Sequence, residues 1–205
     1  IPIDAAIAIG SEIAKALAEL HRNDVVHRDL KPSNVMLTAS GIKLLDFGLA
    51  KLRDGEYEDT NRKATRSLRL TGEGTVLGTL PYMAPEQVEG RPADARTDTF
   101  ALGVVLYEMI TGREPFQGTS RASLAAAILT REPAAISSLI RAAPASLDRV
   151  VQKCLAKSPD ERWQSAGDLA GDVRCGKEDA RRRAALRLHH GLGQLGADRE
   201  FQRLA

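Results

Sequence analysis

The stretch Thr99–Ile110 constrains the fold more than any other part of the chain, because it is apolar on almost every side. As a helix it would extend about 18 Å at about 1.5 Å per residue, and a helix without a polar face has to be enclosed by other elements. It is too short to span a bilayer, which takes about 20 apolar residues, and it contains Glu108. We therefore expect a buried core helix in a globular domain, for which 43% hydrophobic and 27% charged residues are typical.

Periodicity predicts further helices and one strand pair. Apolar residues recur at spacings of three and four over residues 4–20, which indicates a helix with one buried face. Val35–Leu37 and Ile42–Leu45 are short apolar runs separated by a turn, which predicts a β-hairpin. From Leu124 to Val173 the pattern is helical again and is interrupted by prolines. The expected fold class is α+β, mainly α.

Charge and cysteine content narrow the function classes. The chain has 29 basic and 27 acidic residues and a net charge of +2, so its overall charge does not favour the binding of nucleic acid. Cys154 and Cys175 lack metal-ligand spacing, which is typical of a reduced, cytoplasmic protein. We expect no membrane span. The first residue is not Met, so we expect the chain to begin inside a longer protein.

The segment from His27 to Asn34 carries the most chemistry. Asp29 and Asn34 stand one turn before the hairpin, and Asp46 follows its second strand. Two carboxylates and a carboxamide are hard oxygen ligands of the kind that Mg²⁺ prefers. Lys31 can place a positive charge beside a phosphoryl group in transfer. These residue types together predict phosphoryl-transfer chemistry.

These motifs resemble the protein kinase superfamily. The catalytic loop corresponds to His27–Asn34, the magnesium-binding turn to Asp46–Gly48, and the end of the activation segment to Ala84–Glu86. Lys31 before Pro32, together with Gly78-Thr79, resembles the serine/threonine class in its bacterial form. The resemblance covers about residues 3–174 and implies a kinase-like C-terminal lobe over residues 1–175, followed by a basic tail over 176–205.

The resemblance also implies roles for individual residues. Asp29 would accept the proton of a substrate hydroxyl, and Lys31 would steady the γ-phosphate of ATP, with Thr79 beside them. Asn34 and Asp46 would hold Mg²⁺, and Met36 would pack beneath the adenine ring. Two plainer interpretations stay open: Asp29 and Asn34 only satisfy loop backbone groups, and Met36 is only a strand core residue.

A long polar segment over residues 52–77 is expected to be an exposed loop. Within it, Thr75, or failing it Thr71, is the expected phosphorylation site, and Arg28 is the expected partner of the phosphate. The plainer interpretation treats both threonines as ordinary solvated residues.

Five residues are expected to act structurally. The resemblance implies a buried ion pair between Glu86 and Arg162 and hydrogen bonds from Asp98 to the catalytic-loop backbone, with His27 and Phe47 also in supporting positions. Helix N-capping is the alternative role for Asp98.

The glycine-rich loop and the strand lysine of kinases do not occur in these residues, so we expect the small lobe to be absent. The predicted function is therefore that of a serine/threonine kinase lobe, which phosphorylates protein substrates when its own small lobe completes it and has little or no activity alone. Pairing of two kinase copies, and a membrane tether elsewhere in the parent protein, are further expectations. The alternative functions are an inactive scaffold module and a small-molecule phosphotransferase, the latter disfavoured by Phe47-Gly48 and Ala84–Glu86. The tail over 176–205 is expected to be a solvated, helical linker.

Overall fold

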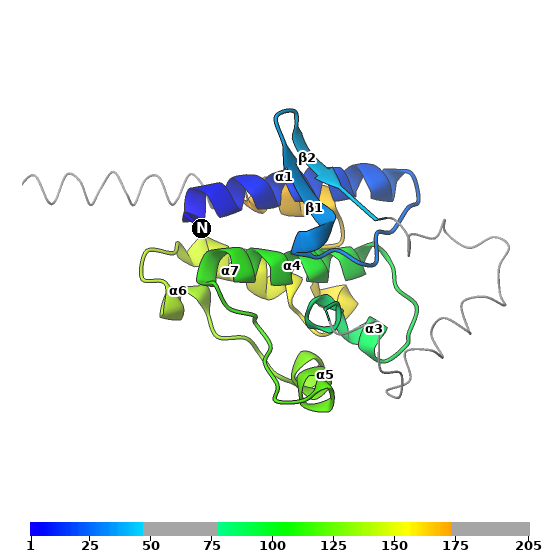
Figure 1. Ribbon diagram of the computed structural model, residues 1–205, viewed down its shortest axis with the longest axis vertical. Helices are drawn as coiled ribbons and strands as arrows, with labels where there is room; N and C mark the ends of the chain where they lie inside the picture. The colour runs from blue at the N-terminus through cyan, green and yellow to red at the C-terminus, as the bar shows by residue number, and fades with distance from the viewer. Residues whose placement is uncertain (47–77, 174–205) are drawn as a thin grey trace, which may run out of the picture.

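A pair of long helices forms the centre of the molecule. The computed structural model describes residues 1–46 and 78–173, in which α1 (Ile3–Arg22) lies beside α4 (Ala95–Thr111) (Figure 1). The two helices approach closely at Gly10, where an added Cβ would collide with the side chain of Leu106. Buried apolar side chains from both helices form one continuous core.

Helix α4 is enclosed as its sequence predicts. Its residues from Thr97 to Tyr107 are all buried, so the predicted core helix is confirmed. Asp94 caps its start by accepting a hydrogen bond from the Arg96 backbone at 2.8 Å. Gly112 ends it in the left-handed conformation, with φ of 69°, which glycine adopts without steric cost.

The predicted hairpin is also present. Strands β1 (Val35–Thr38) and β2 (Gly41–Leu44) pair antiparallel, with Val35 opposite Leu44 and Thr38 opposite Gly41. Strand β2 packs against α1, and the hairpin lies across that helix (Figure 1). Met36 is 46% exposed and Leu37 is 64% exposed, so the interpretation of Met36 as a strand core residue is wrong. The mainly helical fold with one small sheet is confirmed.

Shorter elements complete the described part of the chain: η1 (Pro32–Asn34), η3 (Leu80–Tyr82), α3 (Pro85–Val88), α5 (Arg121–Thr130), α6 (Ile136–Leu139), α7 (Ala145–Cys154), η4 (Pro159–Glu161) and a helical stretch over 166–173. Helix α7 packs on α4, while α5 contacts η3 and α3. The breaks predicted at prolines agree with the ends of these elements.

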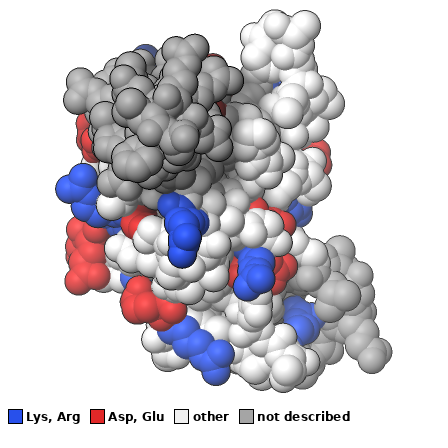
Figure 2. Space-filling model, turned by 90° about the vertical axis from the view of Figure 1, so that its left-hand side faces the viewer, with Lys and Arg blue, Asp and Glu red and all other residues white. Residues whose placement is uncertain are grey.

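Charged side chains of both signs are interspersed on the face shown in Figure 2, in agreement with the nearly balanced net charge. Within residues 1–46 and 78–173, none of the helices combines the length and the hydropathy that a membrane span requires. The segment 52–77 and the tail over 176–205 lie outside the described residues, so the loop and linker predictions stay predictions.

Candidate active site

The loop between α1 and β1 is anchored from beneath by one carboxylate of α4. Asp98 is fully buried, and its two oxygens accept the backbone N–H groups of His27 and Arg28 at 2.8 Å each. His21, in the last turn of α1, places Nε2 2.8 Å from the same carboxylate. The expected bonds from Asp98 to the loop backbone are therefore present. The alternative role as a helix N-cap is wrong, because Asp94 holds that position.

The loop is also joined to Leu45, the residue that follows β2. The buried His27 ring lies with Nε2 3.1 Å from the Leu45 carbonyl, and the Leu45 N–H donates to the Asn34 carbonyl at 2.9 Å. These contacts bring Asn34 close to the end of β2, where Asp46 follows. His27, Asn34 and Leu45 are thus joined at the open end of the hairpin.

Lys31 and Asn34 contact Asp29 directly, and Thr79 joins this cluster through Lys31. The Lys31 ammonium lies 2.8 Å from Asp29 Oδ2 and donates to the Thr79 hydroxyl at 3.0 Å. Asn34 donates from Nδ2 to the Asp29 carbonyl at 2.8 Å and to Asp29 Oδ2 at 3.1 Å. The four residues expected to act in catalysis, Asp29, Lys31, Asn34 and Thr79, are thus brought together. Oδ1 of Asp29 is buried and accepts no hydrogen bond from any residue within 1–46 or 78–173.

Asn34 and Asp46 supply oxygen atoms suited to a hard cation. The Asn34 amide nitrogen is occupied by Asp29, and its carboxamide oxygen accepts one long hydrogen bond, from the Ser33 hydroxyl at 3.5 Å. Asp46 is exposed and has φ of 57°, a left-handed conformation that non-glycine residues seldom adopt. Oxygen donors of these two types fit Mg²⁺, which uses few protein ligands and completes its shell with water and phosphate oxygens.

A buried ion pair fixes the segment that follows η3. Arg162 donates from both terminal nitrogens to the two carboxylate oxygens of Glu86, at 2.8 Å each. Thr97 donates its hydroxyl to the same carboxylate at 2.7 Å. Burial alone would raise the pKa of Glu86, but the hydrogen bonds and charge of Arg162 hold the pKa of this carboxyl below its ordinary value. The expected pairing of Glu86 with Arg162 is therefore present.

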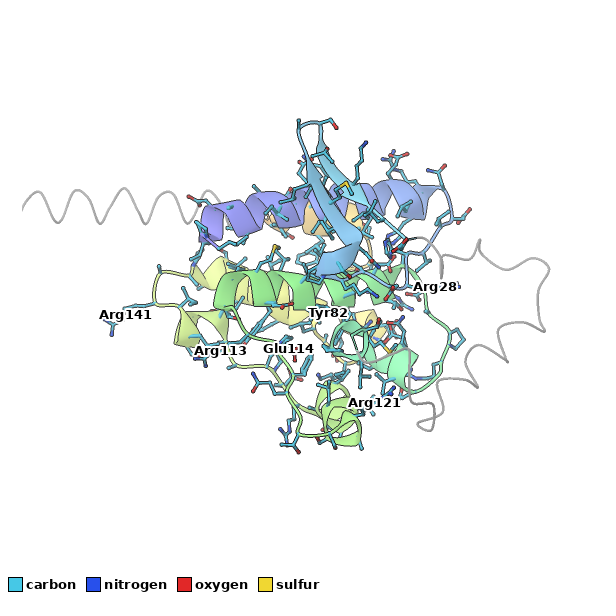
Figure 3. The ribbon with its side chains drawn as sticks, in the orientation of Figure 1. Arg28, Tyr82, Arg113, Glu114, Arg121 and Arg141 are labelled. Carbon is cyan, nitrogen blue, oxygen red and sulfur yellow. The ribbon has the colours of Figure 1, made fainter. Side chains whose placement is uncertain are left out.

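Arg28 lies near the start of α4, at the edge of this cluster (Figure 3). Its φ is 66°, and its Nε is buried without a hydrogen-bond partner among the described residues. Thr71, Thr75 and Phe47 lie outside the described residues, so their predicted roles are neither supported nor contradicted by contacts.

Several contacts of this region could not be predicted from the sequence. Tyr82 donates its hydroxyl to Glu108 at 2.7 Å, and burial and that carboxylate together raise the pKa of Tyr82 (Figure 3). Gln87 donates to the Arg28 carbonyl at 2.8 Å. Together with the contact of His21 to Asp98, these bonds join residues 26, 59 and 77 positions apart. Local sequence patterns carry no signal for such partners.

Comparisons with known proteins agree with this geometry. A family profile described as "Protein kinase domain" matches residues 1–170. The chain is 38% identical over 178 residues to a probable serine/threonine-protein kinase of Corynebacterium efficiens, covering 84% of this chain and 26% of the relative. It is 37% identical over 169 residues to serine/threonine-protein kinase PknB of Mycobacterium tuberculosis, covering 82% and 25%.

A probable serine/threonine-protein kinase of Clostridium perfringens is 36% identical over 180 residues, covering 87% of this chain and 24% of the relative. The chain thus spans about a quarter of the length of these curated relatives. The resemblance to bacterial serine/threonine kinases is confirmed by these relatives. With a matching profile over most of its length and relatives above 30% identity, the chain belongs to the protein kinase domain family.

Proposed function

We propose that these residues form the catalytic lobe of a serine/threonine protein kinase, which transfers the γ-phosphate of ATP to serine or threonine hydroxyls of protein substrates when a small lobe completes it. The observation that carries the proposal is the asymmetric environment of Asp29. One carboxylate oxygen is fixed by Lys31 and Asn34, while the other is buried and has no partner among the described residues. A general base needs such an oriented and unoccupied acceptor.

Asp29 accepts the hydrogen bond of the substrate hydroxyl at Oδ1 and takes its proton as the hydroxyl oxygen attacks the γ-phosphorus of ATP. The bond from that phosphorus to the bridging oxygen breaks, and ADP leaves. Lys31 and Asn34 hold Oδ2, so the carboxylate cannot rotate away from the hydroxyl. Lys31, bonded to both Asp29 and Thr79, stands ready to pair with the negative charge of the transferring phosphoryl group. Positioning of this kind accounts for much of the rate of phosphoryl transfer.

Protein kinases use ATP together with a divalent metal ion, and we propose Mg²⁺ held by Asn34 and Asp46. When bound, the ion neutralises charge on the phosphates. The half-exposed Met36 provides an apolar platform on β1 for the adenine ring. An Asp46→Asn variant should need a higher Mg²⁺ concentration for ATP binding, which titration calorimetry would measure. An unchanged Mg²⁺ dependence would remove Asp46 from the proposed site.

We also propose that phosphorylation of Thr75, or failing it Thr71, supplies a partner for Arg28. Support comes from the buried Arg28 Nε without a hydrogen-bond partner among the described residues. A phosphate adds about −1.5 to −2 charges and three acceptor oxygens, which arginine pairs with well. Peptide mapping of active protein should find one of the two threonines modified. Active protein with neither modified would contradict this part.

The decisive experiment measures the transfer of labelled γ-phosphate from ATP to a generic serine/threonine protein substrate. The enzyme is the full chain, in which a small lobe completes these residues. Asp29→Asn should lower the rate by about 10²–10⁴-fold, the typical contribution of a general base. Asp4→Asn makes the same chemical change at an exposed position in α1 and should leave the rate unchanged.

Two results would contradict the proposal. An Asp29→Asn rate close to that of the wild type would remove Asp29 as the base. If the full chain transfers no phosphate with any divalent metal ion, including after loop phosphorylation, the scaffold function becomes the better explanation.

A further inference from the structure

The side chain of Gln87 joins two parts of the site that are separate in sequence. Its amide oxygen accepts the backbone N–H of Ala84 at 3.0 Å, within the short segment that ends at α3. Its amide nitrogen donates to the Arg28 carbonyl at 2.8 Å, in the loop that carries Asp29. Both ends of one amide are therefore used, and each joins a different backbone segment.

The acceptor of this bond is the peptide group directly before Asp29. The Arg28 carbonyl belongs to the peptide plane that Arg28 and Asp29 share, and the orientation of that plane determines where the Asp29 side chain starts. The Arg28 backbone is in the left-handed region, with φ of 66°, where non-glycine residues persist only when their surroundings hold them. Asp98 fixes the N–H of Arg28, and Gln87 fixes its carbonyl.

The donor of this bond, Gln87, is itself held in place. Its neighbour Glu86 is tied by Arg162 and Thr97, so the backbone that carries Gln87 cannot shift easily relative to α4. On the other side, the Ala84 bond fixes the orientation of the Gln87 amide. A displacement of the segment around Ala84 would therefore be transmitted to the peptide before Asp29.

We propose that Gln87 is a positioning residue that couples the end of the activation segment to the orientation of Asp29. This inference rests on the proposed kinase function, because Asp29 is the group positioned. Gln87 acts through the Arg28 carbonyl and does not contact the reacting atoms. Rotation of that peptide misplaces the carboxylate, and a misplacement of about 1 Å can cost on the order of 100-fold in rate.

Two variants separate the two bonds. Gln87→Glu keeps an oxygen for the Ala84 N–H but places a second oxygen against the Arg28 carbonyl, whereas Gln87→Met removes both bonds. Gln164→Glu is the matched control, because the Gln164 amide also donates only to backbone carbonyls, those of Pro159, Asp160 and Arg162. Within residues 1–46 and 78–173, the Gln164 side chain makes no hydrogen bond to the loop that carries Asp29.

In the full chain we expect both Gln87 variants to lower kcat by about tenfold, with KM for ATP within about twofold of the wild-type value. Gln164→Glu should change neither. The amide ¹⁵N resonance of Asp29, which senses a donor on the preceding carbonyl, should shift in both Gln87 variants and stay in place in the control. A merely structural role would lower the melting temperature without a selective change in kcat or in this resonance.

A Gln87→Glu enzyme with wild-type kcat, or an unmoved Asp29 resonance, would overturn the inference. If Gln87→Met does not fold, Gln87→Glu alone decides. If the wild-type chain transfers no phosphate, the proposed function has failed, and the Asp29 resonance in Gln87→Glu still determines whether the coupling exists.

Discussion

Replacing Arg162 by methionine should remove a large part of the stability of this domain. Arg162 is 1% exposed, and its guanidinium donates to both oxygens of Glu86. It also donates to the carbonyls of Ala156, Arg96 and Lys157, at 2.8, 3.2 and 3.0 Å. Methionine fills a similar volume along the aliphatic stem but provides none of these donors.

The expected loss of stability follows from the groups that are left without a partner, Glu86 above all. Removing one partner of a buried ion pair typically costs about 3–5 kcal/mol, because the other charge is left without compensation. Thr97 then remains as the side-chain donor to Glu86, and three carbonyls also lose a donor, which places the expected loss in the upper part of that range. We expect a loss of about 4–5 kcal/mol, a large share of the roughly 5–15 kcal/mol that stabilises a domain.

Urea unfolding followed by tryptophan fluorescence measures this loss. Trp163 is the single tryptophan of the chain and lies next to Arg162. Arg91→Met is the control: Arg91 pairs with Glu89, the two side chains are 54% and 42% exposed, and such pairs contribute at most about 1 kcal/mol. The double variant Glu86→Leu/Arg162→Met should be more stable than Arg162→Met, since it removes the stranded charge.

An Arg162→Met protein within about 1 kcal/mol of the wild type would refute this account of the pair. A double variant less stable than Arg162→Met would show that the cost lies in lost packing instead of in the unpaired carboxylate.

Three further outcomes follow from burial and packing. Gly103→Ala should destabilise the domain by about 1–3 kcal/mol, because its Cβ would lie 2.5 Å from that of Cys154; Gly171→Ala, in helical conformation with open space around it, should be neutral or stabilising by up to about 1 kcal/mol in the same urea assay. The folded protein lowers the pKa of Glu86, so the unfolded chain binds a proton at this carboxyl more readily; the stability that the ionised carboxylate contributes is present above its ordinary pKa of 4.5 and is lost as the pH falls further. The difference in free energy of unfolding between the wild type and Glu86→Gln should therefore become smaller in acid. A difference that stays constant with pH would contradict the lowered pKa. Burial raises the pKa of the Cys154 thiol, so iodoacetamide should label it only after unfolding, as mass mapping of its peptide would show; rapid labelling of the native protein would be inconsistent with that burial.

Periodic and motif-bearing parts of the structure could be predicted from the sequence. The apolar run of α4 predicted a buried helix, and the close spacing of Asp29, Lys31 and Asn34 before the hairpin predicted that they meet, because hydrophobic period and chain connectivity determine both. The place of Asp46 beside them stays a prediction. Met36 shows the limit of prediction from the sequence. A strand residue was open to two interpretations, and its exposure depends on which other elements cover the strand.

Tertiary partners of polar groups could not be predicted in the same way. Asp98 and Asp94 stand four residues apart near the start of one helix, and the sequence does not show which of them caps it. Packing decides, because it buries Asp98 beneath the loop and leaves Asp94 at the helix end. The bond from Gln87 to the Arg28 carbonyl likewise depends on how two distant segments dock.

The anchoring of the loop by Asp98 has a consequence for the order of events during synthesis. His27 and Arg28 precede the carboxylate that holds their backbone by 71 and 70 positions. At roughly 5–20 residues per second, several seconds pass between the synthesis of the loop and that of its anchor. The loop that carries Asp29 therefore waits without its main support while α1 and the hairpin emerge, and it reaches its final shape only when α4 has been made and docked.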